Sequence, residues 1–161
     1  MKRFAAITLA LIMALICVPV TAEKADREIE GNLAVFTTAE DFAAGTLENV
    51  VTDESIGNGA IVLKEGESEG TYTSVVLGTA PFEYMVASWG ADTPKGTWID
   101  VSARAYVDMK KGWTEWLSWG KWSDSVKRGS VSGECDLAYI STDEFTISGK
   151  DGETASKIQL K

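Results

Sequence analysis

The sequence has no histidine and only two cysteines among its 161 residues. Imidazole is the base in Ser-His-Asp and Cys-His catalysis, and it is a frequent ligand of zinc and other transition metals. Its absence excludes both catalytic arrangements and every histidine-ligated metal site within this chain. We therefore expect the chain to carry no complete enzyme active site of its own.

A hydrophobic run long enough for a membrane helix is also missing. Lys2 and Arg3 precede an apolar stretch over 4–20, and small residues follow up to Ala22. The stretch is shorter than the roughly 20 residues that a bilayer core requires. A positive start, an apolar stretch and a small-residue cleavage site are typical of a secretory signal peptide. We predict a signal peptide over 1–22 and a secreted, extracellular protein, with association with the cell surface left open and no membrane contact after cleavage.

Basic residues are few, with 15 Lys and Arg against 24 Asp and Glu and a net charge of −9. Cleavage of the predicted signal peptide would remove Lys2 and Arg3 and make the charge more negative. A surface of this sign repels nucleic-acid backbones and anionic lipid head groups. We expect no nucleic-acid partner.

Only Cys135 would remain after that cleavage, because Cys17 lies inside the apolar stretch. An internal disulfide is then excluded, although small exported domains often depend on one. The domain must instead be stabilised by its hydrophobic core or by a neighbouring domain. We expect Cys135 to be an inert, partly exposed thiol.

Short apolar runs between glycine, aspartate and asparagine indicate strands after a charged, flexible leader over 23–31. The clearest is 97–107, where the side chains alternate, and the others are 60–63, 72–77, 82–89, 137–140 and 144–147. One helical turn is expected over 39–44, with Thr38 as its cap. We predict an all-β, jelly-roll-like antiparallel β-sandwich over 32–161. The tail over 155–161 begins an alternating strand and stops, so the domain is either short or truncated at its C-terminus.

Four tryptophans spaced three residues apart are the most unusual feature: Trp113, Trp116, Trp119 and Trp122. An ideal strand would place alternate members of this run on opposite faces. A segment with three residues per turn would align all four. The aligned ladder could accept cations between its rings, and the candidates are Arg104, Lys121, Lys127 and Arg128.

Exposed indole rings can stack on sugar rings, so the tryptophans are candidate ligand platforms. In this interpretation Trp89, Trp116 and Trp119 stack on the ligand, while Asp100 and Arg104 orient hydroxyl groups or hold the ladder together. The set of candidate ligand-binding residues is Trp89, Asp100, Arg104, Trp113, Trp116, Trp119 and Trp122. Two alternatives remain: the ladder docks another protein domain, or at least two of the four rings are core residues.

Carboxylates are plentiful, but none shows the convergence of two groups that glycoside hydrolysis needs. No calcium-loop motif is present either. The sequence therefore identifies no catalytic residue and no cofactor, and it leaves a metal, structural calcium in particular, undecided.

Several motifs in order resemble a known family: Gly70-Thr-Tyr-Thr-Ser74, Ser88-Trp-Gly-Ala-Asp-Thr-Pro-Lys-Gly-Thr97, Val101-Ser-Ala-Arg104, Trp116-Leu-Ser-Trp-Gly-Lys-Trp-Ser123 and Tyr139-Ile-Ser-Thr-Asp143. From about Asn32 onward the chain resembles the N-terminal sandwich domain of secreted C39-like cysteine peptidases of Gram-positive bacteria. In that family a papain-like catalytic domain with its Cys and His follows the sandwich. The resemblance implies the sandwich fold and an accessory role, and it does not bring peptidase activity to this chain.

Three functions are therefore open. The main prediction is a secreted, non-catalytic accessory or binding module that holds a carbohydrate or cell-wall polymer on tryptophan platforms. The alternative is a structural N-terminal domain that packs on a downstream C39-like catalytic domain, which would leave an apolar patch exposed in the isolated domain. A hydrolase with paired carboxylates ranks below both.

Overall fold

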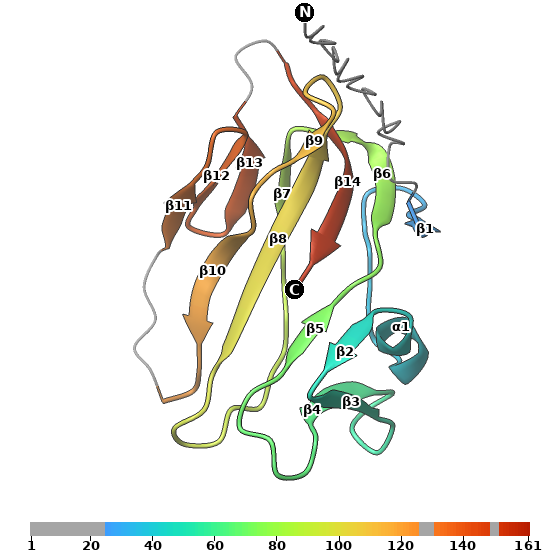
Figure 1. Cartoon of the computed structure of the whole chain (residues 1–161), viewed down its shortest axis with the longest axis vertical. Coiled ribbons are helices and arrows are strands. Elements are labelled where there is room, and N and C mark those ends of the chain that lie inside the picture. The colour runs from blue at the N-terminus through green and yellow to red at the C-terminus, as the bar shows by residue number, and fades with distance from the viewer. Residues whose placement is uncertain (1–24, 126–130, 149–151) are drawn as a thin grey trace, which may run out of the picture.

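The computed structural model describes residues 25–125, 131–148 and 152–161, and nearly all of its regular structure is β-strand (Figure 1). The predicted all-β class is confirmed. Jelly-roll connectivity stays a prediction. The predicted signal peptide over 1–22 and the cation candidates Lys127 and Arg128 lie outside the described residues.

Two larger sheets and two strand pairs make up the molecule. The six-stranded sheet has the order β1-β6-β14-β8-β10, with β9 beside β8; its strands are β1 Arg27–Glu28, β6 Leu77–Phe82, β14 Ala155–Leu160, β8 Ile99–Val107, β10 Leu117–Trp122 and β9 Gly112–Trp113. The four-stranded sheet has the order β11-β12-β13-β7, formed by β11 Ser132–Glu134, β12 Ala138–Ser141, β13 Glu144–Ile147 and β7 Tyr84–Val86. The two pairs are β2 Thr46–Glu48 with β5 Thr71–Thr73, and β3 Val50–Asp53 with β4 Ala60–Leu63. Among these described strands, only the β1–β6 pairing is parallel.

The core lies between the two larger sheets. Ala103, Ala105 and Val107 of β8 are fully buried there, together with Ile140 of β12 and Phe145 of β13. The predicted alternation over 97–107 is thus confirmed, because every second residue of β8 faces the core. Small alanines on one sheet opposite large side chains on the other allow the two layers to interdigitate at native density.

The C-terminal strand β14 occupies the centre of the six-stranded sheet, between β6 and β8 (Figure 1). The backbone groups of Lys161 and Ser102 exchange two hydrogen bonds of 2.8 Å, so the ladder extends to Lys161. On the other side, the buried Ser74 accepts a 2.9 Å hydrogen bond from the Leu160 N–H through its hydroxyl. The tail over 155–161, for which the sequence predicted a strand that begins and stops, is therefore a central strand of the fold.

The predicted leader also contributes to this sheet. Arg27–Glu28 (β1) pairs with the beginning of β6, and the Asp26 N–H donates to the carbonyl of Val76 over 2.9 Å. Its charged composition suggested a flexible segment, but an edge strand needs only backbone pairing and tolerates exposed charge. No helix of the described residues is long and apolar enough to span a membrane.

The helix α1 (Ala39–Ala43) covers one end of the two strand pairs (Figure 1). Thr38 caps it as predicted: its hydroxyl accepts from the Asp41 N–H over 3.1 Å, and the Asp41 carboxylate accepts from the Thr38 N–H over 3.1 Å. This reciprocal capping box satisfies backbone donors that a short helix leaves open. Phe42 of α1 then meets the ring of Tyr72 edge-to-face, with ring centroids 5.7 Å apart.

The side chain of Tyr72 is expected to make the stability of the protein depend on pH in the alkaline range. Its hydroxyl is buried and has no hydrogen-bond partner among the described residues. Burial, with a smaller contribution from Asp41 and against the effect of Arg27, raises the pKa of Tyr72 from 10.0 to about 12. Because the folded state favours the protonated phenol, we expect the contribution of Tyr72 to the free energy of unfolding to be unchanged by pH below about 10 and to fall as the pH rises from about 10 to about 12.

In the Tyr72→Phe variant the free energy of unfolding should fall less as the pH rises above 10. Urea unfolding between pH 9 and pH 11 measures this difference. At neutral pH the variant should be as stable as the parent or more stable, because it removes an unpaired buried hydroxyl. The exposed Tyr84 supplies the control, and an equal flattening by Tyr84→Phe would contradict the assignment to Tyr72.

Candidate functional site

The outer face of β8 and β14 carries the candidate site. Ala103 and Ala105 face the core, so Arg104 between them points outward. The register places Tyr106 beside Lys157 and Arg104 beside Gln159. Four side chains from two strands that are distant in the sequence are thereby brought together on one face.

Arg104 is held from several sides. Its Nε and Nη2 donate to Gln159 Oε1 over 3.0 and 2.7 Å. Its guanidinium carbon lies 4.5 Å from the ring centroid of Trp113 and 5.0 Å from that of Trp116. Cation–π contacts of this kind contribute about 0.5–2 kcal/mol each, so the guanidinium is fixed by two rings and one amide.

The same pattern continues on both sides of Arg104. Lys161 Nζ lies 4.8 Å from the Trp116 ring, and Lys157 Nζ lies 4.8 Å from the Tyr106 ring. Tyr106 meets Trp113 edge-to-face, with ring centroids 5.7 Å apart. We call this set the cation–aromatic row, and it consists of Lys157, Tyr106, Trp113, Arg104, Trp116 and Lys161.

The four spaced tryptophans do not form one ladder. Trp113 and Trp116 belong to the row, whereas Trp119 is 7% exposed and packs between Trp89 and Phe145, with ring centroids 6.2 and 6.3 Å away. The register of β10 shifts between Ser118 and Lys121. Gly120 has a φ of 77° within this shift, a conformation that favours glycine. Trp116 and Trp119 face opposite sides, as in an ideal strand, whereas Trp113 and Trp116 share a side, because residues 114–116 lie between β9 and β10 and interrupt the alternation.

The remaining candidate residues lie apart from the row. Trp122 is half-buried as the cross-strand partner of Ile99, and Trp89 is half-buried against the core. Asp100 is exposed at the start of β8, where its carboxylate accepts a short hydrogen bond from the Ser118 hydroxyl. Trp89, Trp116 and Trp119 do not form one exposed platform, because Trp119 is buried in the core and the half-buried Trp89 packs against it.

Three residues of the site were missed by the sequence analysis: Lys157, Gln159 and Lys161. The alternation in the tail was a usable signal, since it places these three on one face of a strand. The strand that pairs with this tail could not be predicted, because the pairing between β14 and β8 joins segments about 50 residues apart in the sequence.

Aromatic faces, and not carboxylates, contact the cations Arg104 and Lys161. Two ion pairs of described residues are Arg27–Asp41 and Lys110–Glu153, at 3.2 and 2.8 Å, and neither involves these two cations. A sugar ring would have to displace the cations before it could stack on Trp116. In the described part of the chain, no group of Cys, Asp and Glu is arranged to hold a metal ion.

The outer face of the four-stranded sheet has the opposite character. Tyr84, Val86 and Tyr139 are 63%, 60% and 40% exposed on it. Glu144 is the cross-strand partner of Val86, and no Lys or Arg occurs in β7, β11, β12 or β13. We call this surface the acidic tyrosine face.

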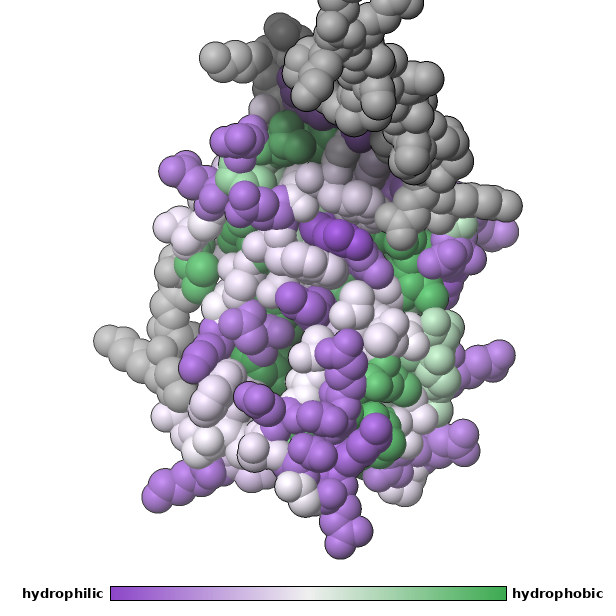
Figure 2. Space-filling view, viewed as in Figure 1, coloured by the Kyte–Doolittle hydropathy of each residue, from purple (hydrophilic) through white to green (hydrophobic). Residues whose placement is uncertain are grey.

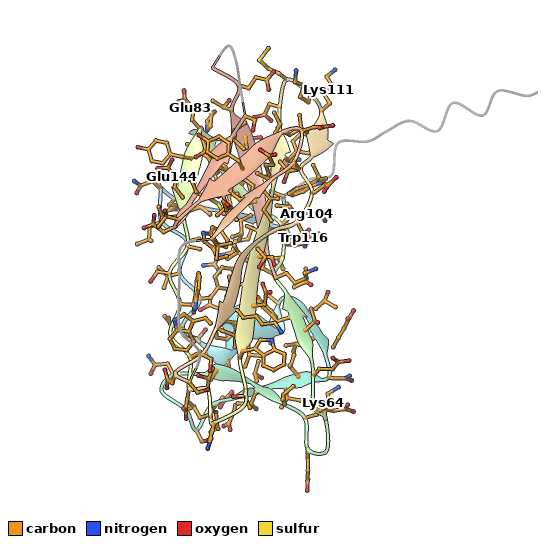
Figure 3. The ribbon with its side chains drawn as sticks, turned by 90° about the vertical axis from the view of Figure 1, so that its left-hand side faces the viewer. Lys64, Glu83, Arg104, Lys111, Trp116 and Glu144 are labelled. Atoms are coloured by element: carbon orange, nitrogen blue, oxygen red, sulfur yellow. The ribbon has the colours of Figure 1, made fainter. Side chains whose placement is uncertain are left out.

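Figure 3 places Arg104 and Trp116 on one side of the sandwich and Glu83 and Glu144 on the other. Figure 2 shows the first side, where hydrophilic residues and residues of near-neutral hydropathy cover most of the surface and hydrophobic residues form separate patches. Arg104 and Glu144 therefore lie on opposite faces of the sandwich.

Comparison with known proteins bears on the whole sandwich. A family model described as the peptidase C39 N-terminal domain matches residues 32–161. This confirms the resemblance drawn from the sequence motifs, and its start coincides with the expected start of the sandwich. No curated protein and no solved structure matches the chain.

Proposed function

Since the chain belongs to the peptidase C39 N-terminal domain family, we propose that it is a non-catalytic domain that packs on the cysteine-peptidase domain of a C39-like enzyme. One observation carries this proposal: the family match spans residues 32–161, while the chain has no histidine to activate a cysteine nucleophile. The only cysteine of that span, Cys135, is half-buried and packs against the core, which is a structural environment.

The acidic tyrosine face supports a docking role. Tyrosine is enriched at protein interfaces because it offers a large apolar ring together with one polar tip. Exposed Tyr84, Val86 and Tyr139 on the outer face of the four-stranded sheet supply such contacts, and the neighbouring Glu144 adds negative charge. A peptidase domain that presents Lys or Arg around an apolar patch would be complementary to this face.

The proposal is tested by titrating this chain with a separately produced C39 peptidase domain, taken from a family member that contains both domains. We expect saturable association by isothermal titration calorimetry, and the double variant Tyr84→Ser, Tyr139→Ser should weaken it about tenfold or more. Met109→Ser, which removes an exposed apolar side chain from a turn outside this face, should leave the association unchanged.

Two results would overturn the proposal. Absence of association with the peptidase domain would remove the docking role. Hydrolysis of a peptide by this chain alone, at a rate abolished by Cys135→Ala, would remove the non-catalytic assignment. The tryptophans give no comparable support to the carbohydrate-binding prediction, because the rings of the row are engaged by cations and Trp119 is buried.

A further inference from the structure

We propose that the open edge of β7 binds an extended, basic peptide segment as an added β-strand. Strand addition to a sheet edge is a recurring way of holding peptides, in which backbone groups supply affinity and side chains supply selectivity. The site consists of Tyr84, Met85 and Val86 at the rim of the acidic tyrosine face, with Glu83 and Glu144 beside them. This binding needs no peptidase domain and is a function beyond docking.

The first argument lies in the backbone groups of β7 that point away from β13. β7 ends the four-stranded sheet, and among the described strands it pairs with β13 alone. The Ile147 N–H donates to the Glu83 carbonyl over 2.8 Å, which makes these two residues a hydrogen-bonded pair of the antiparallel ladder. Such pairs alternate with non-hydrogen-bonded ones, so Tyr84 and Val86 direct their N–H and C=O groups outward. These four groups have no partner among the described residues, and a further strand would pair with them.

The second argument lies in the composition of β7. Proteins protect sheet edges with charged residues, bulges or very short strands. The other edges of the two larger sheets are of this kind: β1 is two charged residues, β11 contains Gly133 and Glu134, and the register of β10 shifts. β7 carries no charge, and its Tyr84 and Val86 are residue types enriched in strands. An edge of this composition is suited to accept an added strand.

The charge around the edge selects the occupant. Glu83 is exposed directly before β7, and Glu144 lies across the ladder from Val86. Neither carboxylate forms an ion pair with a described residue, and Figure 3 shows both on the same side of the sandwich. Because β7, β11, β12 and β13 contain no Lys or Arg, a basic side chain of a peptide meets complementary charge without a competing cation in these strands.

A second copy of the chain fits this edge less well. Two β7 strands in contact would bring two sets of Glu83 and Glu144 together, in molecules that each carry a net charge of −9. Like charges that face each other oppose association. The occupant that avoids this repulsion is an extended stretch in which lysine or arginine alternates with apolar residues. Its basic side chains then lie on the outer face with Glu144, and its apolar side chains continue the side on which Met85 packs against the core.

The test uses a hexapeptide that alternates lysine and valine, with the lysines replaced by glutamate in the charge control. Fluorescence anisotropy of the labelled peptide, titrated with the full chain at low salt, should show saturable binding that weakens as salt is added. The glutamate peptide should bind at least about tenfold more weakly, because its charges repel Glu83 and Glu144. Hydrogen exchange followed by NMR should slow at the Tyr84 and Val86 amides on saturation. It should stay unchanged at Met85, whose N–H already bonds to β13.

The Val86→Pro variant removes one outward N–H and leaves the hydrogen bonds to β13 intact, as edge strands allow when the lost donor faces solvent. It should raise the Kd about tenfold, because one backbone hydrogen bond is lost and the proline ring occupies its place. Val86→Thr keeps the branched shape and the N–H and should retain most of the affinity. Val35→Pro is the matched control: it makes the same exchange at a 45% exposed valine outside the described strands and helix, and it should leave the Kd unchanged.

Backbone N-methylation of the peptide tests the geometry without changing the protein. In an added strand, alternate N–H groups of the peptide face β7 and the others face solvent. Methylation of the lysine amides and methylation of the valine amides should therefore differ, since one set should abolish binding and the other should leave it nearly unchanged. This measurement decides the question even where Val86→Pro disturbs the fold.

Four results would overturn the proposal. These are no saturable binding at low salt, equal binding of the lysine and glutamate peptides, equal effects of the two methylation patterns, and a dimer in analytical ultracentrifugation that Val86→Pro abolishes, because a second copy would then occupy the edge. Failure of the peptide test leaves docking to a peptidase domain untouched, because docking is measured with that domain and also depends on Tyr139 of β12, two strands from the edge. Failure of the docking titration likewise leaves the peptide result untouched, because the peptide is tested without a peptidase domain.

Discussion

The Trp119→Ala variant is expected to lose about 3–5 kcal/mol of unfolding free energy, the cost typical of removing a large aromatic ring from a core. Trp119 is 7% exposed, its ring packs near Trp89 and Phe145, and its Nε1 donates to the carbonyl of Asp143 over 3.1 Å. Alanine would leave a cavity between the two sheets and an unpaired carbonyl. Urea-induced unfolding followed by far-UV circular dichroism measures this loss.

Two matched variants separate burial from ring chemistry. Trp119→Phe keeps most of the packing and should cost only about 1–2 kcal/mol, for the lost hydrogen bond and the smaller ring. Trp116→Ala removes an identical side chain three residues away that is half-buried and makes cation–π contacts with Arg104 and Lys161, so about 1–3 kcal/mol is expected. A larger loss of unfolding free energy for Trp116→Ala than for Trp119→Ala would contradict the assignment of Trp119, and not Trp116, to the core.

Deletion of 155–161 is expected to prevent folding altogether. These residues form β14, which pairs with β6 on one side and β8 on the other. Without them the six-stranded sheet is split, two strand edges are left unpaired, and the core loses the buried Ala155 together with Ile158 and Leu160, which pack against it. A domain with a total stability of about 5–15 kcal/mol cannot absorb such a loss.

The deletion is assessed by proton NMR, where the loss of dispersed amide signals reports an unfolded chain. Gln159→Ala is the control within the same strand: it keeps the backbone ladder and removes only the amide that binds Arg104. We expect this variant to remain folded. A folded, cooperatively melting deletion variant would show that β14 is dispensable and that the strand order β6-β14-β8 is wrong.

The sequence contained enough to predict the elements whose pattern is local. Alternation in β8 identified both the strand and its buried side, because a period of two is a direct consequence of the pleat. The Thr38 cap of α1 was readable because the capping residue and its partner Asp41 lie three positions apart. Strands β4 and β13 were placed with the bounds that the structure has, since turn residues enclose them.

Features that depend on distant pairing were not predictable in this way. The spacing of the tryptophans is regular, but the break between β9 and β10 places Trp113 on the same side as Trp116, and nothing in the spacing indicates that break. Likewise, β1 was read as a flexible leader because its charges say nothing of the backbone pairing with β6.

The candidate site was predicted in part. Arg104, Trp113 and Trp116 were identified, and their contact as cation and rings was among the geometries considered. The other half of the row comes from β14, and a single sequence contains no information on which strand lies beside β8. The acidic tyrosine face was missed for the same reason. Tyr84 of β7 and Tyr139 of β12 share one surface only because β13 pairs with both strands.

The position of β14 has a consequence for the order in which the protein can assemble during synthesis. The strand that joins β6 to β8 leaves the ribosome after both of them and after every strand of the four-stranded sheet. Until residue 160 has emerged, the facing edges of β6 and β8 stay open to solvent and to any other chain with an unpaired strand. Closure of the largest sheet is therefore a late and long-range event, and chains released before residue 155 would be prone to aggregate.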